Sequence, residues 1–165
     1  MKHERLGNVY NLRGKYGKIV FPNNIKAIFD KEDYDTIVNY HWRLSINNHL
    51  YTNIHGVQTP ITEIILKGNG VYIPEDKMVD HIDRNPLNNT KIKLRICSVG
   101  ENAFNKSIRI DNTSGKTGVY KYRDKWVSKI GFHGKLIHLG YFEDFGDAVK
   151  ARELAEKEYF GKFAP

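Results

Sequence analysis

The sequence has few of the features that mark secreted or membrane proteins. Its single cysteine, Cys97, allows no internal disulfide and no Cys-x-x-Cys zinc site. No run of residues approaches the ~20 apolar positions that a membrane helix needs. Residues 1–18 carry charges and glycines where a secretory signal has its apolar core. With 165 residues and no internal repeat, the chain is expected to form one domain or two small ones in the reducing cytoplasm.

Positive charge is concentrated in the second half of the chain. The net charge is +7, yet residues 1–76 are nearly neutral, with 9 basic and 8 acidic side chains. Residues 84–135 hold 12 basic and 3 acidic side chains, interleaved with the aromatic residues Phe104, Tyr120, Tyr122 and Trp126. This pattern is typical of a surface that binds a polyanion. A solvated basic loop region is the simpler alternative.

Residues 1–76 predict a small mixed α/β region without a chemical motif. Strand-like runs at 17–21 and 25–30 flank a turn at Pro22. Residues 30–40 have a helical pattern, and Asn47-Asn48 separates the two halves of a hairpin. A helix is expected to start after Pro60. We expect this region to support a site elsewhere and to add contacts to a partner.

Residues 77–109 carry the strongest chemical signal. Asp80 and His81 lie in a strand-like segment, followed by a loop rich in turn-forming residues and a second short strand at 94–97. Ser98 and Glu101 form a capping box, so a helix is predicted to begin near residue 99 with Asn102 in its first turn.

A carboxylate, an imidazole and a carboxamide at this spacing fit phosphodiester hydrolysis. Asp80 and Asn102 offer oxygen ligands for one divalent ion, Mg²⁺ or Mn²⁺ in preference, although Ca²⁺ also fits. His81 can accept the proton of a water molecule near neutral pH. Arg84, Arg95 and Lys106 are the basic side chains expected to contact a DNA phosphate here. Taken singly, each residue is more often a polar loop or helix-surface residue.

Residues 114–165 predict a second unit after a linker at 110–113. Three alternating strands, at 118–122, 125–132 and 135–142, precede a helix that starts near Asp144. Alternation directs Trp126, Ser128, Ile130 and Phe132 towards the helix. The opposite face is expected to carry Tyr120, Tyr122, Lys129, Leu136, His138 and Gly140, and Tyr141 is expected in the core.

Residues 79–106 resemble the HNH nuclease family, in the branch found in homing endonucleases. The residues that carry the resemblance are VDHIDRNPLNN, KLR and ENAFN. The resemblance implies a strand–loop–strand–helix unit, the ββα-metal core, around one metal ion. It also implies Asp80 and Asn102 as the metal ligands and His81 as the general base.

Residues 114–164 resemble the APETALA-type, or ethylene-response-factor, DNA-binding domain, through SGKTGVY, KW, HLGYF and FGKFA. This implies that a three-stranded sheet packed on one helix contacts double-stranded DNA. At the positions that this family uses to contact DNA, the chain has Tyr120, Tyr122, Lys129 and His138. Lys121, Arg123, Lys125 and Lys135 are expected to contact phosphates.

Lys93 departs from the HNH pattern. The family has an asparagine at this place, which helps to fix the loop that carries the histidine. A lysine side chain accepts no hydrogen bond, and its ammonium would repel a nearby metal ion. Lys93 and His81 occupy the two catalytic positions of the pattern. Because of Lys93, our hypothesis is that the chain binds DNA but cuts it weakly or not at all.

The sequence therefore predicts an α+β protein that acts as a site-specific DNA endonuclease of the homing type. The alternative is a catalytically inactive DNA-binding protein or regulator. An RNA-binding module is a third interpretation, but it leaves the residues around Asp80 unexplained. No dimer seam is evident, so a monomer on DNA is expected, with no small-molecule substrate.

Overall fold

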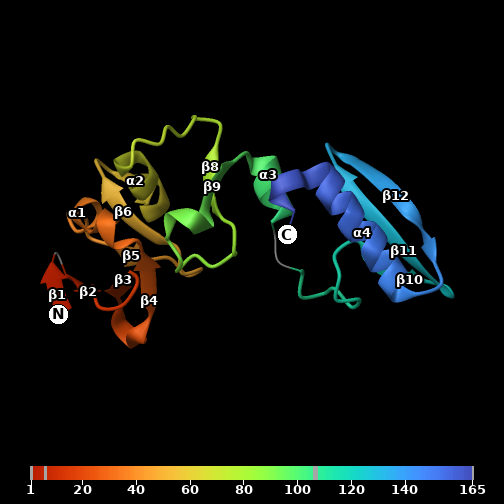
Figure 1. The fold of residues 1–165 in the computed structure, drawn as a ribbon, viewed down its shortest axis with the longest axis horizontal. Helices are drawn as coiled ribbons and strands as arrows, with labels where there is room; N and C mark the ends of the chain where they lie inside the picture. Colours follow the sequence, from red (N-terminus) through yellow and green to blue (C-terminus); the bar gives the residue numbers. More distant parts are fainter. Residues whose placement is uncertain (1, 6, 106–107, 165) are drawn as a thin grey trace. The chain divides into compact units, whose positions relative to one another are not determined.

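The computed structural model describes residues 2–5, 7–105 and 108–164. The chain divides into two units, Met1–Val99 and Gly100–Pro165, which are described separately below. Both units combine helices with small antiparallel sheets, so the expected α+β class is confirmed (Figure 1). Among the described helices, none has the length and apolar character to cross a membrane.

The first unit begins with a four-stranded antiparallel sheet in the order β1-β2-β3-β4. Its strands are β1 (Lys2–Arg5), β2 (Asn8–Asn11), β3 (Gly17–Val20) and β4 (Lys26–Phe29). The turn between β3 and β4 is a 3-10 helix, η1 (Pro22–Asn24), as the proline predicts. Tyr10, Ile19 and Phe29 alternate with more exposed neighbours and are fully buried, so one face of the sheet supplies the core. Strands β1 and β2 were not expected from the sequence.

A three-stranded sheet and two helices complete the core of this unit. The sheet holds β5 (Arg43–Leu44), β6 (Leu50–Ile54) and β7 (Val57–Pro60), with the expected turn at Asn48 in the left-handed region. The helical segment at 30–40 is shorter than predicted, as η2 (Lys31–Asp33) and α1 (Tyr34–Ile37). Helix α2 (Ile61–Gly68) starts directly after Pro60 and buries Ile61 and Ile65.

Trp42 joins these parts of the first unit. Its indole is 1% exposed and donates from Nε1 to the carbonyl oxygen of Ile37. The side chain of Asn8 accepts from the Trp42 amide at 2.7 Å and donates to the Trp42 carbonyl at 3.0 Å. A buried asparagine satisfied at both ends fixes the start of the β5–β6 hairpin against β2.

A two-stranded ribbon closes the first unit. Strand β8 (Met78–His81) pairs with β9 (Leu94–Cys97), and η3 (Lys91–Lys93) leads into β9. Both strands fall where the sequence predicts them.

The second unit is a three-stranded antiparallel sheet packed on one long helix. It holds α3 (Val99–Phe104), β10 (Val119–Tyr122), β11 (Lys125–Phe132), β12 (Lys135–Phe142), α4 (Phe145–Phe160) and η4 (Gly161–Phe163). Asp144 caps α4 by accepting from the amides of Gly146 and Asp147, which confirms the predicted start of this helix.

The division between the units falls inside α3. The reason is the packing of Phe104. Its ring stacks on that of Phe160 with centroids 3.9 Å apart, and it joins the cluster formed by Ile130, Ala155 and Phe160. The helix that carries Asn102 therefore packs with the second unit.

Gly118 shows how tightly α4 packs on the sheet. Its φ is +77°, and a Cβ at this position would collide with the carbonyl oxygen of Lys129 and the guanidinium of Arg152. Arg152 donates to that same carbonyl and, from Nε, to Glu156 at 2.8 Å. Both side chains are nearly fully buried, so the pair fixes the position of α4 on β11.

Candidate functional site

The ribbon of β8 and β9 sets Asp80 and His81 beside a constrained loop. Asp80 pairs with Arg95 and His81 pairs with Leu94 across the two strands. One step beyond, the amide of Ile82 donates to the carbonyl oxygen of Lys93 at 2.8 Å. Lys93 thus closes the loop through its main chain, a contact that does not depend on its side chain.

Asp80 is held by Arg95. The guanidinium donates from Nε to the Asp80 Oδ2 atom at 2.9 Å, its Nη2 forms an ion pair with the same oxygen at 2.8 Å, and both side chains are 11% exposed. A charge-assisted contact of this kind restricts the rotamer of the Asp80 side chain. Arg95 contacts Asp80 within the first unit, and its expected contact with a DNA phosphate stays a prediction.

His81 is buried and hydrogen-bonded to Asn89. The imidazole is 7% exposed, and its Nε2 lies 3.1 Å from Oδ1 of Asn89, which is fully buried. The Asn89 amide donates from Nδ2 to the Pro86 carbonyl, which leaves Oδ1 to accept from the imidazole. This network assigns the proton to Nε2, so Nδ1 is the basic nitrogen of the neutral ring.

Burial lowers the pKa of His81 below its ordinary value of 6.5. The hydrogen bond that the imidazole donates to Asn89 opposes this shift, and the nearby imidazole of His49 reinforces it. The ring is therefore mainly neutral at pH 7, the form that can accept a proton.

The loop between β8 and β9 is anchored to the N-terminal sheet. Ile28 of β4 donates to the carbonyl of Leu87 and accepts from the amide of Asn89, both at 2.8 Å. Asp83 accepts from the side chain of Asn88 at 2.7 Å, which ties the two ends of the turn together. The expectation that the N-terminal region supports the site has a physical basis in these contacts.

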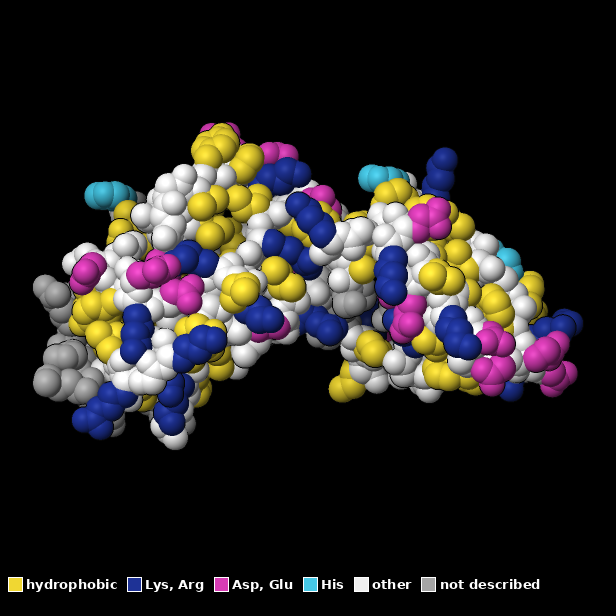
Figure 2. Space-filling view, in the orientation of Figure 1, with side chains coloured by type: hydrophobic (Ala, Val, Ile, Leu, Met, Phe, Trp, Pro, Cys, Tyr) yellow, Lys and Arg dark blue, Asp and Glu magenta, His cyan; other side chains and the backbone are white. Residues whose placement is uncertain are grey.

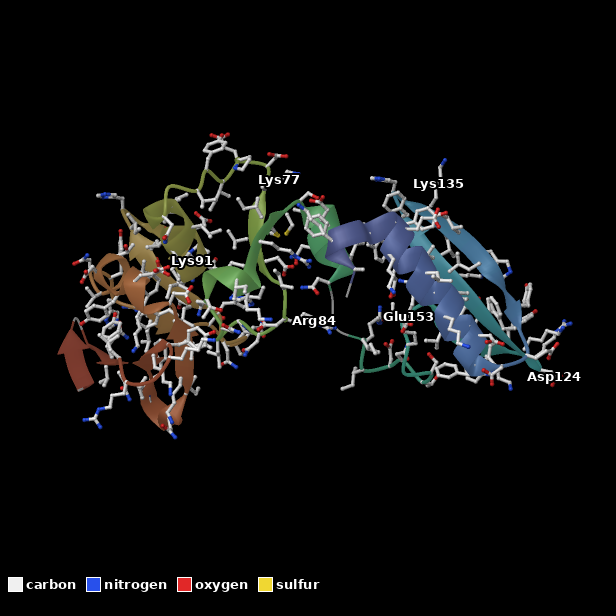
Figure 3. All side chains as sticks on the ribbon, in the orientation of Figure 1. Lys77, Arg84, Lys91, Asp124, Lys135 and Glu153 are labelled. Carbon is white, nitrogen blue, oxygen red and sulfur yellow. The ribbon has the colours of Figure 1, made fainter. Side chains whose placement is uncertain are left out.

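Lys91 adds a second anchor. Its ammonium contacts Glu32 and lies 3.1 Å from Oδ1 of the buried Asp33, while its amide donates to Asp30 at 2.8 Å. Figure 3 shows Lys91 on the first unit among oxygen-bearing side chains. Three acidic residues just after β4 thus hold the segment that leads into β9.

Asn102 lies on α3 in the second unit, and Lys106 lies outside the described residues. The convergence of Asn102 with Asp80 therefore stays a prediction. Within residues 2–5, 7–105 and 108–164, no group of three or more His, Cys, Asp or Glu side chains could hold a metal ion.

Arg84 is the exposed basic residue of the loop. Its backbone is in the left-handed region, with φ +57°, and its amide donates to the His81 carbonyl at 2.9 Å. Figure 3 shows its side chain on the loop of the first unit. Its place close to His81 in the loop is compatible with the phosphate contact expected from the sequence.

The open face of the C-terminal sheet brings together four residues predicted to contact DNA. Tyr120 pairs with Val127 across β10 and β11, and Lys129 pairs with His138 across β11 and β12. The Lys129 ammonium lies 5.5 Å from the centroid of the Tyr120 ring, and hydrogen bonding to that tyrosine raises the pKa of Lys129. Tyr122 is exposed on the same side, two residues along β10.

For two residues, the predicted face of the sheet was wrong because the sheet has a bulge. The register of β11 against β12 shifts between Ser128 and Lys129, where one residue of β12 is left unpaired. Beyond the bulge, Gly140 pairs with Ser128 and turns to the helix side. Tyr141 pairs with Val127 on the open face and is 59% exposed, not buried in the core.

The expected phosphate-binding residues lie around the edges of this sheet. Arg123 lies in the β10–β11 turn with φ +54°, and Lys125 pairs with Glu143 at 2.8 Å. Figure 3 shows Asp124, next to Arg123, and Lys135 at opposite ends of the sheet. Lys121 instead turns to the helix side, with its ammonium 5.3 Å from the Trp126 ring centroid. On the face of this unit shown in Figure 2, acidic and basic side chains are mixed.

His49 and the pocket beside His81 were missed by the sequence analysis. The His49 ring lies 5.9 Å from that of His81 between centroids, and both line a pocket of about 400 Å³ in the first unit. The two residues are 32 positions apart: His49 lies directly before β6, and His81 ends β8. No local pattern signals such a contact, which only the tertiary structure creates.

Comparisons with known proteins found two viral relatives. The chain is 34% identical over 110 residues to "Uncharacterized HNH endonuclease L560" of Acanthamoeba polyphaga mimivirus. The match covers 63% of this chain and 52% of that protein, so the chain spans about half the length of this relative. No family model and no solved structure matches the chain.

The second relative is "Protein 3.8" of Escherichia phage T7. It is 34% identical over 94 residues, which make up 56% of this chain and 77% of the phage protein. Identity at this level over most of a relative's length reflects common descent. The chain therefore belongs to the same family as protein 3.8 of phage T7.

Proposed function

We propose that this chain is a DNA endonuclease of the homing type that hydrolyses phosphodiester bonds with one divalent metal ion. The observation that carries the proposal is the state of His81, which is buried, neutral and fixed in one tautomer by Asn89. A histidine in this state is suited to accept a proton at pH 7. The name of the mimivirus relative supports a nuclease in preference to other hydrolases.

The proton transfer uses the two nitrogens of His81 differently. Nδ1 accepts a proton from the attacking water, and the positive charge that develops on the ring is stabilised by the hydrogen bond from Nε2 to Asn89. Asn89 is therefore a positioning residue. Its contact with the imidazole supports a role like that of the asparagine which the HNH family has at the position of Lys93.

The residue types of the two predicted ligands suit a hard cation. Asp80 offers a carboxylate and Asn102 an amide oxygen, as the HNH resemblance implies. Mg²⁺ and Mn²⁺ prefer oxygen ligands, and Mg²⁺ keeps several waters, so two protein ligands suffice. When bound, the cation supplies positive charge against the phosphate and the leaving oxygen. Arg95 holds the rotamer of Asp80 for this role.

Double-stranded DNA is the proposed substrate because the second unit offers a suitable surface. Its open sheet face carries Tyr120, Tyr122, Lys129 and His138, and a sheet of this kind can enter the major groove. This agrees with the APETALA-type resemblance of residues 114–164. Arg84 would add a phosphate contact near His81.

A plasmid-nicking assay tests the proposal. The full chain is incubated with supercoiled DNA and Mg²⁺, with and without chelator, and compared with His81→Ala. We expect nicking by the wild-type protein that chelator abolishes and that His81→Ala lowers by about 10²-fold or more, the usual contribution of a general base. His55→Asn is the matched control, since His55 is an exposed turn residue with φ +49° that asparagine tolerates.

Two further measurements separate the possible outcomes. The melting temperature of His81→Ala shows whether loss of a buried ring has unfolded the first unit. Binding of Mn²⁺ by calorimetry, compared between wild-type and Asp80→Ala, tests the ligand role without reference to cleavage. Tight DNA binding without nicking under any divalent ion would support instead a catalytically inactive DNA-binding protein, the alternative that Lys93 raises.

A further inference from the structure

The pocket beside His81 is not used by the proposed hydrolysis. It lies entirely in the first unit, between the β6–β7 hairpin, the start of α2 and strand β8. Its volume is about 400 Å³. His81 forms part of its wall, so whatever occupies the pocket sits next to the general base.

The charge of the pocket argues against a phosphate as its ligand. The described residues that line it include the carboxylate of Glu63 and no lysine or arginine. Lys67 pairs with Glu63 at 2.9 Å but does not line the pocket. An anionic group would therefore meet a negative charge without a compensating cation inside the pocket, so a neutral ligand is favoured.

The walls of the pocket suit a flat ring with polar edges. Leu50, Pro60 and Met78 supply apolar surface, and Tyr51 supplies an aromatic ring. Gln58 can donate and accept, and Glu63 can only accept when ionised. A nucleobase has two apolar faces and an edge of donors and acceptors, and it is neutral at pH 7.

We propose that this pocket takes one unstacked base of the DNA substrate. The inference rests on the proposed function, since it assumes that the chain acts on DNA. A base held here would bring its own phosphate towards His81. Because a carboxylate accepts hydrogen bonds, Glu63 favours a base with an exocyclic amino group, such as cytosine, over thymine.

Binding to bulged duplexes tests the proposal. Three labelled duplexes carry a single bulged nucleotide, which is cytosine, thymine or an abasic site, and binding to the full chain is measured by anisotropy in chelator. The abasic bulge keeps the backbone distortion but lacks the base. We expect the cytosine bulge to bind about tenfold more tightly than the abasic bulge, the gain from stacking and pairing one base. The thymine bulge should fall between them.

A pair of amide variants links the effect to the pocket. Gln58 of β7 lies opposite Asn53 of β6, and both are exposed, but only Gln58 lines the pocket. Gln58→Ala should remove most of the preference for the cytosine bulge, whereas Asn53→Ala should keep it. Both variants should retain affinity for the abasic duplex.

The outcomes separate this inference from the proposed function. Equal affinity for the cytosine and abasic bulges, or equal losses in the two variants, overturns the base pocket even if the chain cuts DNA. A preference for cytosine that depends on Gln58 supports the pocket even if no cleavage occurs with Mg²⁺. Failure to bind any duplex overturns both.

Discussion

Replacing Asn89 by alanine provides the sharpest test of how the site is held. Asn89 is fully buried, accepts from His81 Nε2 at 3.1 Å and donates to the Pro86 carbonyl at 3.4 Å. Asn89→Ala leaves the buried N–H of His81 without this acceptor. The cost of such an unsatisfied group is about 1–3 kcal/mol of unfolding free energy.

The fluorescence of Trp42 can report on the unfolding of the first unit, which contains Asn89. The chain has two tryptophans, and Trp42 is buried in the first unit while Trp126 belongs to the second. In a Trp126→Phe background, tryptophan emission during urea unfolding follows the first unit alone. The midpoint and slope of that transition give the free energy of unfolding for each variant.

Lys93→Ala is the matched control. Lys93 closes the loop with its carbonyl oxygen, so we expect a change within about 0.5 kcal/mol. Lys93→Asn should likewise leave the nicking rate unchanged, in contrast to the hypothesis that Lys93 impairs cleavage. The reasoning fails if Asn89→Ala is as stable as wild-type, or if Lys93→Asn restores a missing activity.

Three further predictions concern the faces of the sheet and the buried histidine. Trp126→Ala should destabilise the second unit by about 3 kcal/mol, since the indole packs on Phe145 with ring centroids 4.7 Å apart. Tyr141→Ala should change the stability by no more than about 0.5 kcal/mol, because this side chain is exposed. Thermal melts that reverse this order would refute the assigned faces. Lys129→Ala should weaken DNA binding and reduce its salt dependence, measured by anisotropy over a range of KCl. Because burial lowers the pKa of His81, the unfolded chain binds a proton at this residue before the folded chain does as the pH falls. The stability of the first unit should therefore decrease from about pH 6.5 downwards, and it should decrease less in His81→Ala. A stability that does not change with pH in urea titrations of the wild-type protein would contradict this.

Local sequence patterns predicted most of the secondary structure. The turn at Pro22, the hairpin at Asn48, the helix after Pro60 and the cap at Asp144 all lie where proline, asparagine and aspartate restrict the backbone. These signals act over a few residues and therefore need no tertiary context. The candidates Asp80 and His81 were likewise identified from adjacent residue types.

The bulge in the C-terminal sheet marks the limit of that approach. Strict alternation placed Gly140 on the open face and Tyr141 in the core. One unpaired residue of β12 reverses both assignments, because each later side chain then points to the other side. The extra residue arises from pairing between two strands and is invisible in either strand alone.

The sequence by itself determined the α+β class, the elements marked by local turn and capping residues, and the residue types that can perform hydrolysis. Only the tertiary structure decided that Asn89 holds His81, that Arg95 holds Asp80, and that His49 borders the same pocket. Hydrogen bonds and burial join residues that are distant along the chain. They set the tautomer and the pKa on which the proposed chemistry depends, and composition and spacing do not specify them.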